Sequence, residues 1–175
     1  MGEAIPAWVD GQLAPVEKLE VHRRGLRHPA VSVFVMAGGR VLLQRRALQK
    51  YHTPGLWANT CCTHPIWGET PLDCATRRLK QELGIEGLAP EWREQVEYRA
   101  DVGGGMVEHE VVEVFVAEAT EGLTIAPDPA EVMDWHWAEL GELAREVARE
   151  PARFAPWLGI YLARHGAAIF GDLAK

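Results

Sequence analysis

The chain has 175 residues, a length that suits one ordinary domain and is sufficient for a core with a dry pocket. Its composition, 47% hydrophobic and 25% charged, is typical of a globular protein, and its longest apolar run, residues 30 to 37, is far too short to span a bilayer. The formal net charge of −7 gives no general attraction to nucleic acid or to anionic lipid. We therefore expect a soluble monomer or homodimer, with neither nucleic-acid nor membrane partners.

The N-terminus and the cysteines indicate a cellular compartment. The N-terminus lacks a basic region followed by an apolar stretch, and three cysteines cannot all pair with one another. This pattern is typical of a cytosolic protein with reduced thiols. We therefore expect a cytoplasmic location.

The first half of the chain is predicted to be mostly sheet. Residues 8 to 13 have the pattern of a strand and turn, residues 31 to 36 and 41 to 44 that of a hairpin, and residues 56 to 62 are expected to be extended. Residues 69 to 83 then form the first helix, because apolar positions recur at helical spacing and a glycine follows as a stop. The recurring positions are Leu72, Thr76, Leu79 and Leu83, and the stop is Gly84.

The second half mixes strands and helices. Residues 96 to 100 and 106 to 117 are predicted to pair across a run of three glycines, and Trp135 and Trp137 alternate on a short strand. A helix follows over residues 138 to 149, ends before Pro151, and precedes a last helical segment from about residue 156 to residue 170. The sequence therefore predicts an α/β layered fold in which helices flank a mixed sheet.

Two acids begin an apolar strand face. Because side chains alternate along a strand, Glu108 and Glu110 should point the same way as Val112, Val114 and Val116. They could be ordinary surface charges at a solvated strand end, or a bound cation could remove the repulsion between them. His22, His28 and His64 are candidate further ligands, and three nitrogen with two oxygen donors would suit Mn²⁺ or Zn²⁺. A single histidine is more often a surface or hydrogen-bonded residue, and no local spacing joins these five.

Ordered motifs along nearly the whole chain resemble one family. They are Lys18, His22 and His28; Arg45-Arg46-Ala-Leu-Gln-Lys50; Trp57-x-Asn59-x-x-Cys62-x-His64-Pro65; Gly68-Glu69; Arg77-Arg78-x-x-x-Glu82-Leu83-Gly84; Tyr98-Arg99-Ala100; Glu108-x-Glu110; and Phe154-x-Pro-Trp157. Each motif is weak alone, but their number and order argue against chance. The chain resembles the type I isopentenyl-diphosphate delta-isomerases, a divergent branch of the Nudix superfamily. This implies a Nudix-like layered sandwich, with a single isomerase domain over residues 1–175.

The resemblance implies the reversible conversion of isopentenyl diphosphate to dimethylallyl diphosphate in isoprenoid biosynthesis, by protonation and deprotonation. It makes Cys62 and Glu110 the catalytic pair on either side of the substrate, and leaves open which of them donates the proton in each direction. Trp157 matches an indole whose face stabilises a carbocation-like intermediate in a water-free pocket, although a core tryptophan is the alternative. Tyr98 is expected to relay or orient the proton at Glu110.

Two metal sites are also implied by the resemblance. The first holds Mn²⁺ or Zn²⁺ on His22, His28, His64, Glu108 and Glu110, and its expected task is to fix Glu110 and adjust its acidity. The second is a Mg²⁺ ion that bridges Glu82, the Cys62 backbone carbonyl and the substrate diphosphate. The alternative for Glu82 is an acid on the helix surface.

Basic side chains stand out in this acidic chain. Lys18, Arg46, Lys50 and Arg78 are the candidates for diphosphate binding. Arginine can hold phosphate oxygens through its planar fork, and lysine adds a point charge. Their neighbours Arg45 and Arg77 are interpreted as structural or solvated.

The remaining cysteines are predicted to be small buried residues. Neighbouring strand positions face opposite ways, so Cys61 should point away from the Cys62 pocket, and Cys74 lies on the first helix. A zinc site formed by Cys61, Cys62 and His64 is the alternative.

The rival function is that of a Nudix diphosphate pyrophosphohydrolase. Its sequence box would carry an Arg-Glu pair and further glutamates to hold metals for water attack, whereas residues 77 to 82 read Arg-Arg-Leu-Lys-Gln-Glu and keep only the last acid. A non-catalytic metal-dependent binding module is a third interpretation. The chain departs from the family pattern at Thr63, at Cys61 and in a shortened step between His22 and His28, and none of these changes removes a catalytic group.

Overall fold

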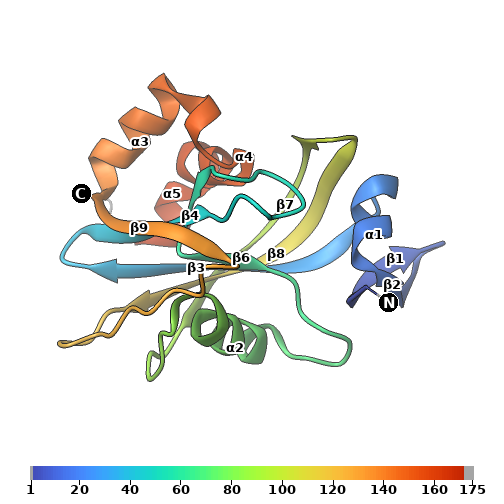
Figure 1. Ribbon diagram of the computed structural model, residues 1–175, viewed down its shortest axis with the longest axis horizontal. Helices are drawn as coiled ribbons and strands as arrows, with labels where there is room; N and C mark the ends of the chain where they lie inside the picture. The colour runs from blue at the N-terminus through green and yellow to red at the C-terminus, as the bar shows by residue number, and fades with distance from the viewer. Residues whose placement is uncertain (1, 172–175) are drawn as a thin grey trace.

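A mixed seven-stranded sheet forms the central layer of the molecule (Figure 1). The computed structural model describes residues 2–171. The sheet strands are β3 (His28–Ala37), β4 (Arg40–Arg46), β5 (Trp57–Ala58), β6 (Cys61–Thr63), β7 (Glu91–Gly103), β8 (Met106–Glu118) and β9 (Val132–Glu139). Their order is β5-β4-β3-β8-β7, with β6 paired to β3 and β9 paired to β4.

Helices cover both faces of this sheet. One face carries α2 (Pro71–Leu83), and the other carries α3 (Leu140–Arg149), α4 (Pro156–Ile160) and α5 (Gly166–Phe170), as Figure 1 shows. A short 3-10 turn, η1 (Pro151–Arg153), precedes α4, and a π-helical turn, η2 (Tyr161–His165), joins α4 to α5. The predicted fold, a mixed sheet flanked by helices, is confirmed. No helix within residues 2–171 is long and apolar enough to cross a membrane.

Two hydrophobic cores lie on opposite faces of the sheet. Val112 and Val114 belong to the core under α3 to α5, whereas Val33 belongs to the core under α2. Strand alternation puts Glu108 and Glu110 on the same face as Val112, as the sequence predicted. A slip of one residue would exchange the two faces, and each fully buried valine or leucine is worth about 1.5–3 kcal/mol relative to an exposed one. Packing of the cores therefore fixes the direction of both acids.

Strand pairing brings distant residues beside β8. β3 and β8 run parallel with His28 opposite Glu110. β7 and β8 form a long antiparallel hairpin that places Tyr98 opposite Glu110 on the other side. The pairing of β6 with β3 sets Cys62 opposite Ser32. His28 and Tyr98 thus lie on either side of the same carboxylate.

An N-terminal hairpin leads into a short helix. The elements are β1 (Ala4–Val9), β2 (Gln12–Glu17) and α1 (Lys18–Arg24). The Glu17 carboxylate caps α1 by accepting hydrogen bonds from two amides of its first turn, at 3.1 and 2.9 Å. The helix ends at Gly25, whose φ of 60° is left-handed and favours a residue without Cβ. The sequence predicted only a strand and turn here, and α1 with Gly25 spans the shortened step between His22 and His28.

Helix α2 differs from its prediction in two respects. It begins at Pro71 because Thr70 is the N-cap, and the Thr70 hydroxyl accepts a hydrogen bond from the Asp73 amide at 3.2 Å. The buried face carries Ala75, Leu79 and Leu83 together with Cys74 and Glu82. Leu72 and Thr76 are exposed, so these two predicted apolar positions are wrong.

Other predicted elements are confirmed with shifted ends. The extended stretch 56–62 is interrupted between β5 and β6 by Thr60, whose hydroxyl donates to the Leu42 carbonyl at 2.6 Å and accepts from the Val35 amide at 2.8 Å. This hydroxyl bridges β3 and β4 where their direct pairing has ended. The helix expected from residue 138 begins at Leu140, because Glu139 is its N-cap. Both hairpins, the tryptophan-bearing strand and the last helical segment are confirmed.

Candidate active site and metal centre

Five side chains that are far apart in the sequence meet at one buried point. They form the His/Glu cluster: His22 on α1, His28 on β3, His64 just after β6, and Glu108 and Glu110 on β8. One ligand atom from each lies within 4.8 Å of all the others, and every member is buried. The predicted convergence of these residues is therefore present in the structure.

The donor set of the His/Glu cluster fits a divalent ion. His22 Nδ1 lies 2.6 Å from the Lys18 carbonyl oxygen, and His28 Nδ1 lies 2.7 Å from the Leu26 carbonyl oxygen. A carbonyl only accepts, so each Nδ1 carries the proton and, in the neutral ring, the Nε2 lone pair faces the cluster. Glu108 Oε2 accepts no hydrogen bond within residues 2–171, although His22 Nε2 and His28 Nε2 lie 3.2 and 3.4 Å from it. A cation between these electron-rich atoms would satisfy all of them.

Electrostatics give the two carboxylates opposite proton affinities. Burial raises the pKa of Glu110 to about 8, and the neighbouring charge of Glu108 adds to this. Burial also opposes the charge on Glu108, but contacts from His22, His28 and His52 hold its pKa well below the ordinary value. For His28, the two glutamates outweigh burial and raise its pKa to about 10. The two carboxylates therefore make this site favourable for positive charge.

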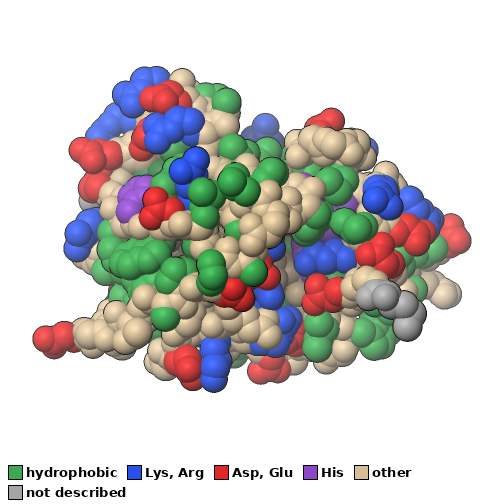
Figure 2. Space-filling model, in the orientation of Figure 1, with side chains coloured by type: hydrophobic (Ala, Val, Ile, Leu, Met, Phe, Trp, Pro, Cys, Tyr) green, Lys and Arg blue, Asp and Glu red, His purple; other side chains and the backbone are tan. Residues whose placement is uncertain are grey.

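A small cavity of about 20 Å³ opens beside the His/Glu cluster. Its lining includes predicted site residues from six different motifs: Cys62, Glu110, Trp157, Lys18, Arg46, Lys50, Arg78 and Glu82. Tyr98 reaches the site through its hydroxyl, which donates a hydrogen bond to Glu110 Oε2 at 2.7 Å. In Figure 2, Lys and Arg side chains gather near the centre of the face shown, with acidic side chains beside them.

The adjacent cysteines face opposite sides of the sheet, as predicted. Cys62 lines the cavity, and its thiol pKa is raised well above the ordinary value, by burial first and then by the charge of Glu110. Cys61 is fully buried in the core under α2, together with Cys74. Since Cys61 lies across the sheet, the alternative zinc site of Cys61, Cys62 and His64 is not formed.

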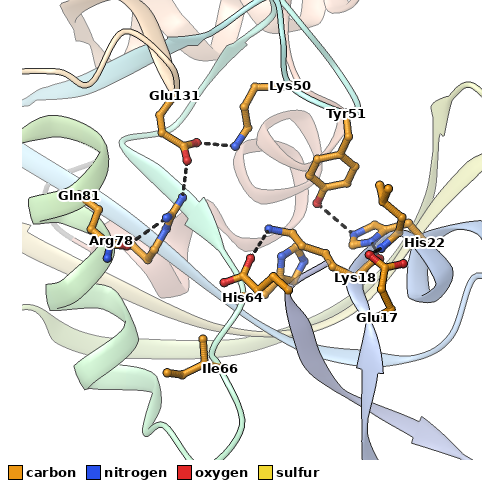
Figure 3. Close-up of polar contacts among 12 residues, drawn as sticks. Glu17, Lys18, His22, Lys50, Tyr51, His64, Ile66, Arg78, Gln81 and Glu131 are labelled. Atoms are coloured by element: carbon orange, nitrogen blue, oxygen red, sulfur yellow. Dashed lines mark hydrogen bonds and ion pairs between the residues drawn. The ribbon is translucent and has the colours of Figure 1, made fainter. Parts of the chain in front are cut away.

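Three of the four basic residues that line the cavity are held by acids. Lys50 Nζ lies 2.5 Å from Glu131 Oε2, and Arg78 Nη2 lies 3.4 Å from Glu131 Oε1, so both side chains point toward one carboxylate (Figure 3). Lys18 pairs with Glu3 at 3.3 Å. The neighbouring arginines stay outside the cavity: Arg45 Nε donates to a backbone carbonyl at 2.9 Å, and Arg77 pairs with Glu69 at 2.6 Å.

Glu82 is buried, so the interpretation as an acid on the helix surface is wrong. It is 4% exposed, accepts a hydrogen bond from Gln44 Nε2 at 2.8 Å, and lies 2.5 Å from Arg78 Nη2. Both Glu82 and Cys62 line the cavity. The Mg²⁺ site on Glu82 and the Cys62 carbonyl stays a prediction.

Comparison with known proteins places the chain in a family. A family model for the NUDIX domain matches residues 26–158. The chain is 66% identical over 173 residues to the isopentenyl-diphosphate Delta-isomerase of Cereibacter sphaeroides, covering 99% of this chain and 98% of that protein. It is 62% identical over 174 residues to the enzyme of that name from Dinoroseobacter shibae, with 99% of each covered. The chain belongs to the isopentenyl-diphosphate Delta-isomerase family.

Membership of this family confirms the resemblance, the isomerase function and the NUDIX assignment drawn from the motifs. Among solved structures, the DR0079 protein of Deinococcus radiodurans has a TM-score of 0.73 at 14% identity, covering 93% of this chain and 98% of that one. A MutT NUDIX hydrolase from Burkholderia pseudomallei has a TM-score of 0.61 at 23% identity, covering 79% and 98%. At such identities the likeness shows the fold alone.

Two site residues of the isomerase were missed by sequence reasoning. His52 is buried in the loop after β4, and its Nε2 lies 2.5 Å from Glu108 Oε1. The hydroxyl of Tyr51 lies 3.4 Å from His22 Nε2 and points toward it (Figure 3). Neither residue belongs to a periodic pattern. The available signal was their place directly after Lys50, in the loop that follows Arg46.

Asn59 is a third missed residue, since its motif was recognised but no role was given to it. Its side-chain nitrogen donates to Ser32 Oγ and to the Cys61 carbonyl, both at 3.1 Å. Its side-chain oxygen accepts from Trp157 Nε1 at 3.1 Å. Asn59 therefore fixes the indole of Trp157 relative to the strand that carries Cys62.

Proposed function

We propose that the chain interconverts isopentenyl diphosphate and dimethylallyl diphosphate by adding a proton to one carbon of the substrate and removing a proton from another. One observation carries this proposal: a thiol, Cys62, and a carboxylate, Glu110, line the same buried cavity together with the indole of Trp157. A 1,3-shift of a double bond needs a proton donor and a proton acceptor on the two sides of the allyl unit, which this pair can supply.

Cys62 and Glu110 are the proposed catalytic residues. Because burial keeps the Cys62 pKa well above its ordinary value, the thiol carries its proton at neutral pH. In the metal-free site, burial and then the charge of Glu108 raise the pKa of Glu110 to about 8, so this buried carboxyl has a high affinity for a proton. Tyr98 orients this carboxylate by donating to Oε2, while Oε1 faces His64 Nε2 at 2.9 Å. Either member can act as acid in one direction and as base in the other.

Trp157 is the proposed stabiliser of the positive charge. Protonation of the terminal alkene carbon leaves a tertiary carbocation-like centre, which reacts with water unless the pocket is dry. The indole is 1% exposed and its N–H is held by Asn59, so its orientation is fixed before substrate arrives. A desolvated cation over an indole face is stabilised by about 2 kcal/mol.

The diphosphate is proposed to bind to Lys18, Arg46, Lys50 and Arg78. Lys50 and Arg78 already converge on the Glu131 carboxylate. Diphosphate oxygens can replace part of these contacts, because charge-assisted hydrogen bonds to arginine and lysine are among the strongest in proteins. Glu131 therefore keeps two basic side chains in place before substrate binds.

Metal ions complete the proposed site. The five donors of the His/Glu cluster support Mn²⁺ or Zn²⁺, and Glu82 supports a Mg²⁺ ion shared with the diphosphate. When bound, the first ion would fix Glu110 and adjust its acidity. The three free cysteines support a reducing, cytoplasmic location for this step of isoprenoid biosynthesis.

Product identification tests the proposal. The purified protein is incubated with isopentenyl diphosphate and Mg²⁺, and the products are separated by chromatography. Dimethylallyl diphosphate is expected, and in D₂O deuterium should enter the methyl groups and the C2 position of recovered substrate and product. Released phosphate would instead indicate the pyrophosphohydrolase, and an unchanged substrate would refute an isomerase.

A further inference from the structure

His52 contacts the Glu108 oxygen that does not face the three cluster imidazoles. Glu108 Oε2 lies 3.2, 3.4 and 4.0 Å from the Nε2 atoms of His22, His28 and His64. Glu108 Oε1 lies 2.5 Å from His52 Nε2. One oxygen of the carboxylate is thus directed at the metal-type donors, and the other is directed at a fourth imidazole.

The contact between His52 and Glu108 requires a proton on one of the two groups. His52 Nε2 and Glu108 Oε1 are close together, although their alignment is not that of a regular hydrogen bond. Two unprotonated acceptor atoms at this distance would repel each other. The other ring nitrogen, His52 Nδ1, lies 3.0 Å from Thr53 Oγ1 and 3.5 Å from Arg46 Nη2. Since the Arg46 guanidinium only donates and the Thr53 hydroxyl can donate, Nδ1 is the acceptor and Nε2 carries the proton.

The backbone around His52 is held in an unusual conformation. Thr53 has a φ of 45°, a left-handed value that is rare for a β-branched residue and costs on the order of 1–3 kcal/mol. In this conformation its hydroxyl lies beside His52 Nδ1. On the other side, Arg46 Nη2 donates to the His52 carbonyl at 3.1 Å. His52 is therefore fixed from the backbone and from its ring, and is 4% exposed.

We propose that His52 is a positioning residue for the metal site: its Nε2–H holds Glu108 Oε1 so that Oε2 faces the Nε2 atoms of the three cluster histidines. The inference rests on the metal site of the proposed function and extends it to a residue outside the His/Glu cluster. Imidazole partners that orient a ligating carboxylate set metal affinity, and their loss costs about 10- to 100-fold. Arg46, which is proposed to bind the diphosphate, contacts the same imidazole ring. His52 therefore also connects the His/Glu cluster with the residues proposed to bind the diphosphate.

Metal affinity tests this role without reference to turnover. Metal-free protein is titrated with Mn²⁺, and free Mn²⁺ is measured by electron paramagnetic resonance for the wild type and four variants. His52→Met removes the N–H donor, His52→Gln retains a side-chain N–H, and Thr53→Val removes only the hydroxyl beside Nδ1. His109→Leu is the matched control, because His109 lies next to Glu108 on β8, is part-exposed and pairs with Glu97.

We expect the Kd for Mn²⁺ to rise about 10- to 100-fold in His52→Met and to stay unchanged in His109→Leu. In His52→Gln the Kd should lie close to the wild-type value, because a side-chain N–H is retained. Thr53→Val should raise it about two- to tenfold, as expected for one hydrogen bond, which keeps the test open should His52→Met not fold. Wild-type affinity in His52→Met or Thr53→Val, or equal losses in His52→Met and His52→Gln, would overturn the positioning role. If His64→Ala kept its metal, the proposed metal site itself would fail instead.

Discussion

Replacing Arg78 by alanine should destabilise the protein and weaken substrate binding at the same time. The guanidinium lies 2.5 Å from Glu82 Oε1 and 3.4 Å from Glu131 Oε1, and the side chains of Arg78 and Glu82 are 15% and 5% exposed. In the variant, Glu82 would keep the hydrogen bond from Gln44 Nε2 at 2.8 Å but would lose its charge partner. A buried carboxylate without a counter-charge is strongly unfavourable.

The size of the effect follows from this burial. Removing one partner of a buried ion pair costs about 3–5 kcal/mol. Since domains are stable by about 5–15 kcal/mol, the variant should lose at least about a fifth of its free energy of unfolding. Adding Glu82→Gln to Arg78→Ala removes the buried charge and should restore most of the loss. The double variant is therefore more stable than the single one, although it contains one more substitution.

Urea unfolding in EDTA at pH 7 measures these free energies. Arg77→Ala is the matched control, because Arg77 is adjacent on α2, is 26% exposed and pairs with Glu69 away from the cavity. The Arg77→Ala variant should lose about 1 kcal/mol of its free energy of unfolding, and its KM for isopentenyl diphosphate should be unchanged. In the folded Arg78→Ala variant, KM for isopentenyl diphosphate should rise while Mn²⁺ or Zn²⁺ content is unchanged. A loss below about 1 kcal/mol, or no recovery in the double variant, would refute the reasoning on the buried pair.

Three further predictions concern the catalytic pair and the metal. Cys62→Ala and Glu110→Gln should each abolish turnover in product assays. Cys61→Ala should be tolerated, because the Cys61 side chain lies in the core under α2. An inactive Cys61→Ala variant would contradict the strand register. His64→Ala should lose both activity and the tightly bound transition-type ion, and undiminished metal content by elemental analysis would remove His64 from the site. Burial raises the pKa of Cys74 to about 12 and that of Cys62 well above its usual value. Iodoacetamide at pH 8 should therefore alkylate these thiols far more slowly in the folded protein than in the unfolded protein, which mass spectrometry can follow. Because these folded-state pKa values are raised, the contribution of the thiols to stability is full below the unfolded pKa of about 8.5 and falls as pH rises above it.

Local sequence signals predicted the elements that are defined by their own residues. The β7–β8 hairpin follows from alternation around a glycine run, and α2 follows from its apolar spacing and from the glycine stop at Gly84. Helix α1 was missed because its cap is Glu17, and glutamate is not among the preferred N-cap residues. On α2, Leu72 and Thr76 fit the helical period as well as the buried positions do, and only contact with β6 and β3 decides which face is buried.

The His/Glu cluster depends on contacts that no local pattern contains. His28 meets Glu110 through the parallel pairing of β3 with β8, and the register of two strands so distant in the chain cannot be derived from periodicity. The ligand set therefore came from resemblance to a family. Neither a local sequence pattern nor the family resemblance predicted His52, because its position is set by a loop with an unusual backbone conformation at Thr53.

The cluster donors are spread along the chain from His22 on the first helix to Glu110 on β8. A metal ion that needs all of these donors would bind tightly to the folded chain and only weakly to the unfolded chain. Binding of the ion and folding of the whole domain would therefore be coupled. At a free ion concentration of 100 times Kd this linkage adds about 2.7 kcal/mol to the free energy of unfolding. If the proposed ion binds, melting temperature and resistance to proteolysis should vary with its supply, and a chelator should act on this protein as a mild denaturant.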